Sequence, residues 1–148
     1  MTAPEPDPRR VLVLGATGYV GSRLVPALLA AGHQVIASSS RPPQPAAYDW
    51  GSEVEWRRCD ATDADQVAAA LEGVDALCYL VHSLDGPRFD ERDRVAAATV
   101  AEGVRRSGVR RLVYLSGLLP ERSAHDLSPT SPRGTRSRRS SRPRTARR

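Results

Sequence analysis

The stretch Gly15-Ala16-Thr17-Gly18-Tyr19-Val20-Gly21 follows the apolar run Val11–Leu14 and precedes an amphipathic segment. A G-x-x-G-x-x-G loop between a strand and a helix presents backbone N–H groups to a pyrophosphate at the helix N-terminus. The first glycine permits the tight turn, the second lets phosphates approach the backbone, and the third allows close helix–strand packing. We expect all seven residues to form a dinucleotide-binding loop; the alternative is an ordinary glycine-rich turn.

Hydrophobic periodicity alternates between strand-like and helix-like segments along the rest of the chain. Strands are expected at five places: Val11–Gly15, Gln34–Ser38, Val54–Arg58, Ala76–Val81 and Leu112–Ser116. The first helix follows the glycine loop, contains Pro26 and ends at Gly32. The second begins after a capping signal, Thr62-x-x-Asp65, and the third spans Phe89–Ser107.

Apolar residues at helical spacing give each helix one face that we expect to be buried. These residues are Val20, Leu24, Leu28 and Ala31 in the first helix, Val67, Ala70, Leu71 and Val74 in the second, and Ala97, Val100, Ala101 and Val104 in the third.

Right-handed crossovers turn this succession of elements into an α/β fold with a doubly wound parallel sheet, the Rossmann arrangement. We expect about five strands in the order 3-2-1-4-5, with a loop or at most a short helix between the second and third. The first and fourth strands then flank the point at which the strand order reverses, so the glycine loop lies at the ligand-binding crevice.

Charge divides the chain into two parts. Residues 1–127 carry 14 Arg against 17 Asp and Glu, a net charge of −3, whereas residues 128–148 carry 8 Arg and no acid. The second part has no aliphatic or aromatic side chain except Ala146. We expect a flexible N-terminus over residues 1–9, one incomplete Rossmann domain over 10–127, and a disordered Arg-rich tail over 128–148.

The composition also excludes several classes of protein. Cys59 and Cys78 are too few for a disulfide framework, and no His/Cys cluster has metal-ligand spacing, so no metal is expected. No signal peptide and no membrane-length apolar run are present, which favours a cytoplasmic protein without a membrane partner. The basic tail could contact nucleic-acid phosphates, but it has no aromatic residue for base stacking; we do not expect a nucleic-acid partner.

The residues after the second strand distinguish between two nicotinamide cofactors. NAD-specific loops usually carry an acid about 20 residues after the glycines, bonded to the ribose 2′-OH. Here Ser38, Ser39, Ser40 and Arg41 occupy that stretch, and the next acid is Asp49. Because hydroxyls and a guanidinium can bind a 2′-phosphate, Ser39, Ser40 and Arg41 favour NADP over NAD. The alternative is that Arg41 is a solvated loop charge.

Four separated motifs, in order, resemble an atypical short-chain dehydrogenase/reductase of the NmrA-like group. They are the glycine loop, Cys59-Asp60 with Thr62-Asp63, Tyr79-Leu80-Val81-His82-Ser83, and the stretch from Val109 to Gly117. The resemblance spans about residues 10 to 120 and implies an NAD(P)-binding fold.

The resemblance also implies roles for single residues. Asp60, with Ala61 beside it, matches a position that binds the adenine amino group; the alternative is an acid at a helix N-terminus. Val81, His82 and Ser83 follow the fourth strand, where they can line the ribose or nicotinamide side, although His82 can equally be structural. Ser116 matches an active-site serine that polarises a substrate carbonyl.

The family's standard catalytic pair is absent from this chain. In that pair a Tyr donates the proton and a Lys four residues later lowers the tyrosine pKa. The chain has no Lys, and no Tyr follows Tyr114. We therefore expect an NAD(P)-binding domain, with NADP(H) favoured, that lacks the substrate lobe; the alternative is a non-catalytic, cofactor-sensing regulator. The likeness stops at Thr130, and we hypothesise a shift of reading frame there.

Overall fold

The central strands are apolar at nearly every position, which is the pattern of a parallel sheet covered by helices on both faces. The structure is a computed structural model that describes residues 7–81 and 89–115. In β1 (Arg10–Leu14) every residue after the first is buried, and in β4 (Ala76–Tyr79) all four are buried. These two strands lie at the middle of the sheet.

All four strand pairs are parallel, and the order is β3-β2-β1-β4-β5, as the sequence predicts. The outer strands are β2 (Gln34–Ser39), β3 (Glu55–Arg58) and β5 (Arg111–Tyr114). Each strand begins and ends within two residues of its expected bounds. The strand order therefore reverses between β1 and β4, where the glycine loop follows β1.

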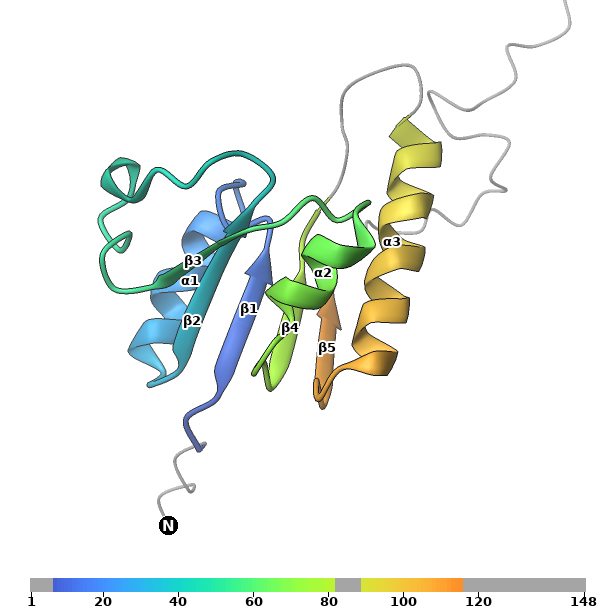
Figure 1. Ribbon diagram of the computed structural model, residues 1–148. Helices are drawn as coiled ribbons and strands as arrows, with labels where there is room; N and C mark the ends of the chain where they lie inside the picture. The colour runs from blue at the N-terminus through green and yellow to red at the C-terminus, as the bar shows by residue number, and fades with distance from the viewer. Residues whose placement is uncertain (1–6, 82–88, 116–148) are drawn as a thin grey trace, which may run out of the picture. The chain divides into compact units, whose positions relative to one another are not determined.

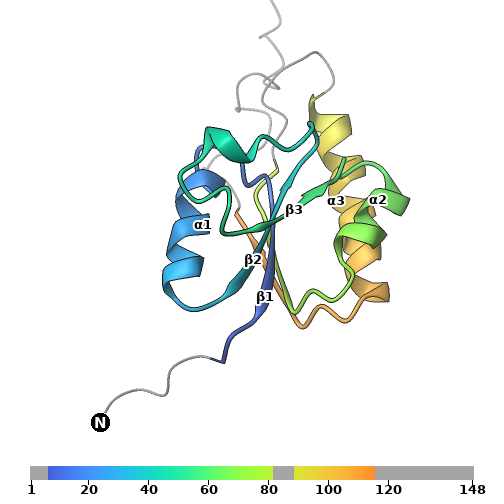
Figure 2. The same cartoon turned by 60° about the vertical axis from the view of Figure 1, so that its left-hand side comes forward.

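The helices divide between the two faces of the sheet. Figures 1 and 2 show α1 (Gly21–Ala30) on one face and α2 (Ala64–Ala70) with α3 (Phe89–Arg106) on the other. Between β2 and β3 the chain forms only a short 3-10 helix, η1 (Pro45–Ala47), as expected. Within the described ranges, no helix is both long and apolar enough to cross a membrane.

Alternate residues of β1, β2 and β4 build two separate cores. Leu12 and Leu14 pack with the buried residues of α2 and α3, whereas Val11 and Val13 pack with Val25 of α1. Cys59 and Cys78 are free thiols, one in each core. Three aromatic rings, Tyr48, Trp50 and Trp56, stack beside the α1-side core and hold the β2–β3 connection there.

The buried face of α1 differs from its prediction. Val20 precedes the helix and is 42% exposed, and Ala31 is exposed, whereas Val25 is completely buried. Leu24 and Leu28 are partly buried beside it, so the face is centred on Val25 rather than on Leu24 and Leu28. The prediction treated Val20 as helical, but Val20 belongs to the glycine loop.

The buried face of α3 is also rotated from its prediction. Ala96 and Val100 are buried, whereas Ala97 and Ala101 are exposed. Gly103 lies on the side of α3 that faces α2, since a Cβ there would lie 2.7 Å from a methyl carbon of Val67. The missing side chain lets the two helices approach closely. All four residues predicted to be buried in and after α2 are buried.

The N-terminal cap of α2 is Asp63 and not Thr62. One oxygen of Asp63 accepts from the amides of Asp65 and Gln66, and the other accepts from the Gln66 side chain. Thr62 instead donates to Asp60 through its amide and its hydroxyl. The prediction was one residue out because Asp63 satisfies the same orphan amides.

Candidate dinucleotide-binding site

A cleft of about 410 Å³ lies where the strand order reverses. The ends of four segments meet there: the glycine loop after β1, the end of β2, the residues after β3 and those after β4. Its walls comprise Leu14, Gly15, Thr17, Gly18, Ser39, Ser40, Cys59, Asp60, Ala61, Thr62, Leu80, Val81, Arg92 and Ala96. A topological switch point is where open α/β sheets bind their ligands.

Two glycines give the loop its shape. Gly15 has a φ of +90°, which L side chains rarely adopt, and it passes directly over the backbone of Leu80. A side chain on Gly21 would collide with the carbonyl oxygen of Gly15 and with the backbone of Ala16. Gly15 is therefore needed for the turn, and Gly21 for the close approach of the start of α1 to the loop.

Gly18 has more space around its Cβ position than Gly15 and Gly21 have. A Cβ there would meet only the oxygen of Gly15, at 3.3 Å, and Gly18 lines the cleft. Among the described residues, the amides of Thr17, Tyr19 and Val20 donate no hydrogen bond to the main chain or to a side chain. Free amides before a helix are what an anionic phosphate group needs.

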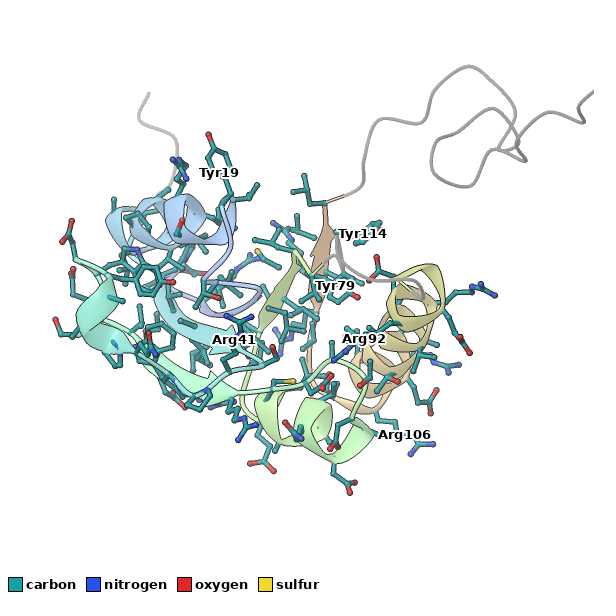
Figure 3. The ribbon with its side chains drawn as sticks, turned by 90° about the horizontal axis from the view of Figure 1, so that it is seen from above. Tyr19, Arg41, Tyr79, Arg92, Arg106 and Tyr114 are labelled. Atoms are coloured by element: carbon teal, nitrogen blue, oxygen red, sulfur yellow. The ribbon has the colours of Figure 1, made fainter. Side chains whose placement is uncertain are left out.

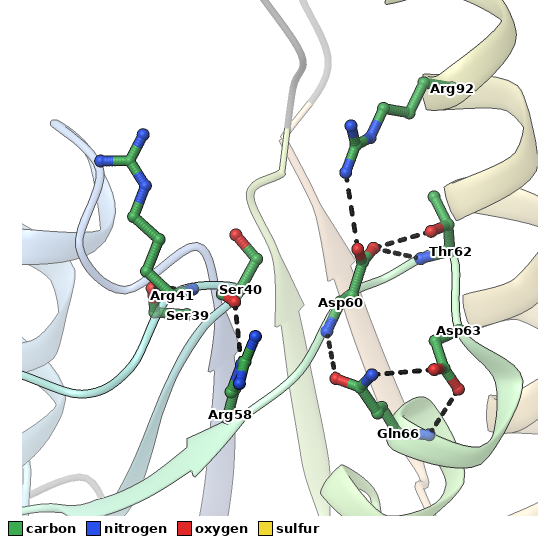
Figure 4. Close-up of polar contacts among 9 residues, drawn as sticks. All are labelled: Ser39, Ser40, Arg41, Arg58, Asp60, Thr62, Asp63, Gln66 and Arg92. Carbon is green, nitrogen blue, oxygen red and sulfur yellow. Dashed lines mark hydrogen bonds and ion pairs between the residues drawn. The ribbon is translucent and has the colours of Figure 1, made fainter.

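Asp60 forms the acidic wall of the cleft. Its Oδ1 accepts from the Thr62 amide at 3.0 Å and from the Thr62 hydroxyl at 2.8 Å, while its Oδ2 lies 3.5 Å from a guanidinium nitrogen of Arg92 (Figure 4). These hydrogen bonds, with the positive charge of Arg92, lower the pKa of Asp60. The carboxylate is therefore an ionised acceptor at neutral pH.

Two arginines lie near the end of β2. The amide of Arg41 donates to the Ser39 hydroxyl at 3.1 Å, and Arg58 Nε donates to the carbonyl oxygen of Ser40 at 3.2 Å (Figure 4). Neither guanidinium forms an ion pair with a carboxylate of the described part of the chain. No acid occupies the end of β2, which is where NAD-specific loops place one.

A second cleft of about 360 Å³ continues from the first and shares Thr17 and Ser39 with it. Arg41 and Tyr48 also line it. The Tyr48 hydroxyl donates to the carbonyl oxygen of Thr17 at 3.4 Å and so joins the β2–β3 connection to the glycine loop.

The structure separates the predicted cofactor residues into groups. Those that line the first cleft are Gly15, Thr17, Gly18, Ser39, Ser40, Asp60, Ala61 and Val81, and Arg41 lines the second. Ala16 is buried and donates its amide to the Ser38 oxygen, which ties the loop to β2. Tyr19 is 76% exposed, with the Arg23 guanidinium over its ring (Figure 3). His82, Ser83 and Ser116 lie outside the described residues.

Sequence reasoning missed four residues at the site. Arg92 lines the first cleft from α3, Thr62 lines it after β3, and Tyr48 lines the second cleft from the β2–β3 connection. Arg58, the last residue of β3, lines neither cleft but donates to the carbonyl oxygen of Ser40, which lines the first. A motif that follows the chain cannot reveal contacts such as that between Arg92 and Asp60, which are 32 positions apart. The described residues contain no group of three or more His, Cys, Asp or Glu that could hold a metal ion.

Comparison with known proteins agrees with this geometry. The NAD(P)H-binding family matches residues 15–138. Sterol demethylase protein B of Methylococcus capsulatus is 37% identical over 131 residues, a match that covers 82% of this chain and 40% of that protein. A 3 beta-hydroxysteroid dehydrogenase/Delta 5-->4-isomerase of Mycobacterium tuberculosis is 33% identical, covering 72% of this chain and 31% of that protein.

Among solved structures, a variant of uronate dehydrogenase from Agrobacterium tumefaciens in complex with NAD superimposes with a TM-score of 0.60 and 26% identity. That match covers 74% of this chain and 41% of the dehydrogenase. This chain thus spans less than half of the length of each of these relatives. It belongs to the NAD(P)H-binding family and is a Rossmann-type, nicotinamide-dinucleotide-binding domain of the short-chain dehydrogenase/reductase kind.

Proposed function

We propose that this domain binds NADP(H) in preference to NAD(H), as the cofactor-binding part of an oxidoreductase. The observation that carries the proposal is that the glycine loop and the residues at the ends of β2, β3 and β4 all line one cleft. The pyrophosphate would lie on the free amides of the loop, and the adenine would lie beside Asp60. The pyrophosphate and the adenine then each meet a protein group of complementary chemistry.

The preference for NADP(H) rests on Arg41 and Arg58. A 2′-phosphate at the end of β2 would lie near the hydroxyls of Ser39 and Ser40 and near two guanidinium groups that have no carboxylate partner in the described structure. Guanidinium–phosphate contacts are charge-assisted and roughly twice as strong as neutral hydrogen bonds. NAD(H) lacks that phosphate, and the chain offers no acid there for its 2′-hydroxyl.

We also propose that the substrate-binding lobe lies outside these 148 residues. This chain matches only 31% and 41% of the length of the two relatives named above as dehydrogenases. The absence of Lys supports this division, because the standard pair cannot form within the chain. The chain by itself is then a binding domain, and the identity of the substrate is set elsewhere.

Titration of the purified chain with NADPH and with NADH tests the proposal. We expect saturable binding of both, tighter for NADPH, without turnover. Arg41→Ala and Arg58→Ala should each weaken NADPH binding by roughly tenfold and leave NADH binding unchanged. Arg94→Ala, an exposed arginine that lines neither cleft, is the control. Equal affinities for the two cofactors in the parent chain would contradict the NADP(H) preference.

A further inference from the structure

The two oxygens of the Asp60 carboxylate are held very differently. Oδ1 accepts two short hydrogen bonds from Thr62. The backbone of Asp60 is fixed as well, because its amide donates a hydrogen bond to the side-chain oxygen of Gln66. Among residues 7–81 and 89–115, the one contact of Oδ2 is the 3.5 Å contact with Arg92. The hydrogen bonds to Oδ1 thus fix the orientation of the carboxylate, while Oδ2 can exchange Arg92 for a new hydrogen-bond donor.

Arg92 is placed to give up that contact at little cost. Its side chain is 63% exposed, and an exposed ion pair of this length contributes little to stability. Arg92 lies in the first turn of the described part of α3 and lines the cleft with Ala96 of the next turn. Ala96 is buried and adds only a small side chain to the wall of the cleft.

We propose that Arg92 is a further dinucleotide-binding residue, whose guanidinium covers one face of the adenine ring after the adenine amino group has taken Oδ2 of Asp60. This inference rests on the proposed function of the cleft. A guanidinium is planar and weakly hydrated, and it stacks on flat aromatic rings. The exchange at Asp60 brings the adenine ring to the oxygen that Arg92 contacts in this structure, so the released guanidinium lies beside the ring.

The test compares Arg92→Ala and Arg92→Lys with the parent chain, using NADPH, AMP and inorganic pyrophosphate as probes. Arg94→Ala is the matched control, because Arg94 lies on the same helix, is exposed and lines no part of the cleft. Thermal unfolding of each variant checks that the fold is kept.

If Arg92 covers the adenine, both Arg92 variants should bind NADPH and AMP more weakly than the parent chain does, by the same factor of roughly 3- to 30-fold for each ligand. Pyrophosphate binding should not change, and the loss of adenine absorbance on binding should be smaller in the variants. Full affinity in Arg92→Ala would overturn the inference. It would also be overturned if Arg92→Lys kept full affinity while Arg92→Ala lost pyrophosphate binding, because Arg92 would then hold phosphate.

These outcomes separate the inference from the function on which it rests. A parent chain that binds no dinucleotide contradicts the proposed function and, with it, the role of Arg92. A parent chain that binds NADPH, together with an Arg92→Ala variant that binds equally well, contradicts the role of Arg92 alone.

Discussion

The carbonyl oxygen of Gly15 occupies the space in which a side chain on Gly21 would begin. Gly21→Ala must therefore move backbone atoms at the start of α1, and we expect it to destabilise the domain by about 2 kcal/mol or more. Thermal unfolding measures the effect. A variant as stable as the parent chain would show that the loop and α1 do not pack as closely as the structure has them.

Gly18 should behave in the opposite way, because its added Cβ would meet only one oxygen, at 3.3 Å, on the cleft side of the loop. We expect Gly18→Ala to fold almost as stably as the parent chain but to weaken NADPH binding by about tenfold or more. Unfolding and titration of the same preparation distinguish the two effects. Unchanged binding in a folded variant would place the phosphates elsewhere.

The lowered pKa of Asp63 predicts that the stability of the fold depends on pH. Hydrogen bonds from the Gln66 amide and side chain, with a further bond from the Asp65 amide, lower its pKa in the folded state. A lowered pKa stabilises the fold above the ordinary value of 3.8, and that contribution disappears as the pH falls through the folded-state pKa.

Asp63→Asn, which keeps the shape and one oxygen acceptor of the cap, should melt at a lower temperature than the parent chain at pH 6. The two melting temperatures should converge as the pH falls below 3.8 and through the lowered folded-state pKa of Asp63. A difference that is constant over this range would mean that the charge of Asp63 does not contribute.

The space around Gly103 predicts what a side chain added between α2 and α3 would do to stability. A Cβ there would lie 2.7 Å and 3.0 Å from side-chain carbons of Val67 and Leu71, whereas nothing lies within 4 Å of the Cβ position at Gly108. We expect Gly103→Val to destabilise the domain by about 1–3 kcal/mol. The control Gly108→Ala should change stability by less than about 1 kcal/mol, and equal losses for the two would contradict the close packing.

Cys59 lines the cleft, but its thiol should be unreactive. Burial, together with the charges of Asp60 and Asp63, raises its pKa to about 11, so at pH 8 about one thiol in a thousand is ionised. We expect iodoacetamide to modify the folded chain far more slowly than the chain in denaturant. Rapid modification of Cys59 in the folded chain, located by peptide mass, would contradict its buried environment.

The sequence predicts the sheet order well because each determinant is local. The glycine loop requires a strand before it and a helix after it, and the apolar run at Ala76–Tyr79 indicates a strand that is covered on both faces. The faces of α1 and α3 were predicted less well, because they depend on contacts with other elements. The side of α3 that faces α2 includes Gly103, where an added Cβ would meet Val67, and nothing in the local pattern of α3 shows this.

The same distinction applies to the candidate site. Residues that belong to one loop, such as Gly15 and Gly18, could be predicted from their spacing alone. Arg92 could not, because its place depends on how α3 lies over the residues that follow β3 (Figures 1 and 4). Arg58 was missed for a similar reason, since only the pairing of β2 with β3 places it beside Ser40.

Calorimetric titration of the folded chain with NADPH tests the central claim most directly, with Gly18→Val as the variant that fills the loop. We predict saturable one-to-one binding by the parent chain and its loss in the variant, with both melting cooperatively. No heat of binding for NADPH or NADH across a range of temperatures, with a parent chain that unfolds cooperatively, would contradict the claim that this cleft holds a dinucleotide.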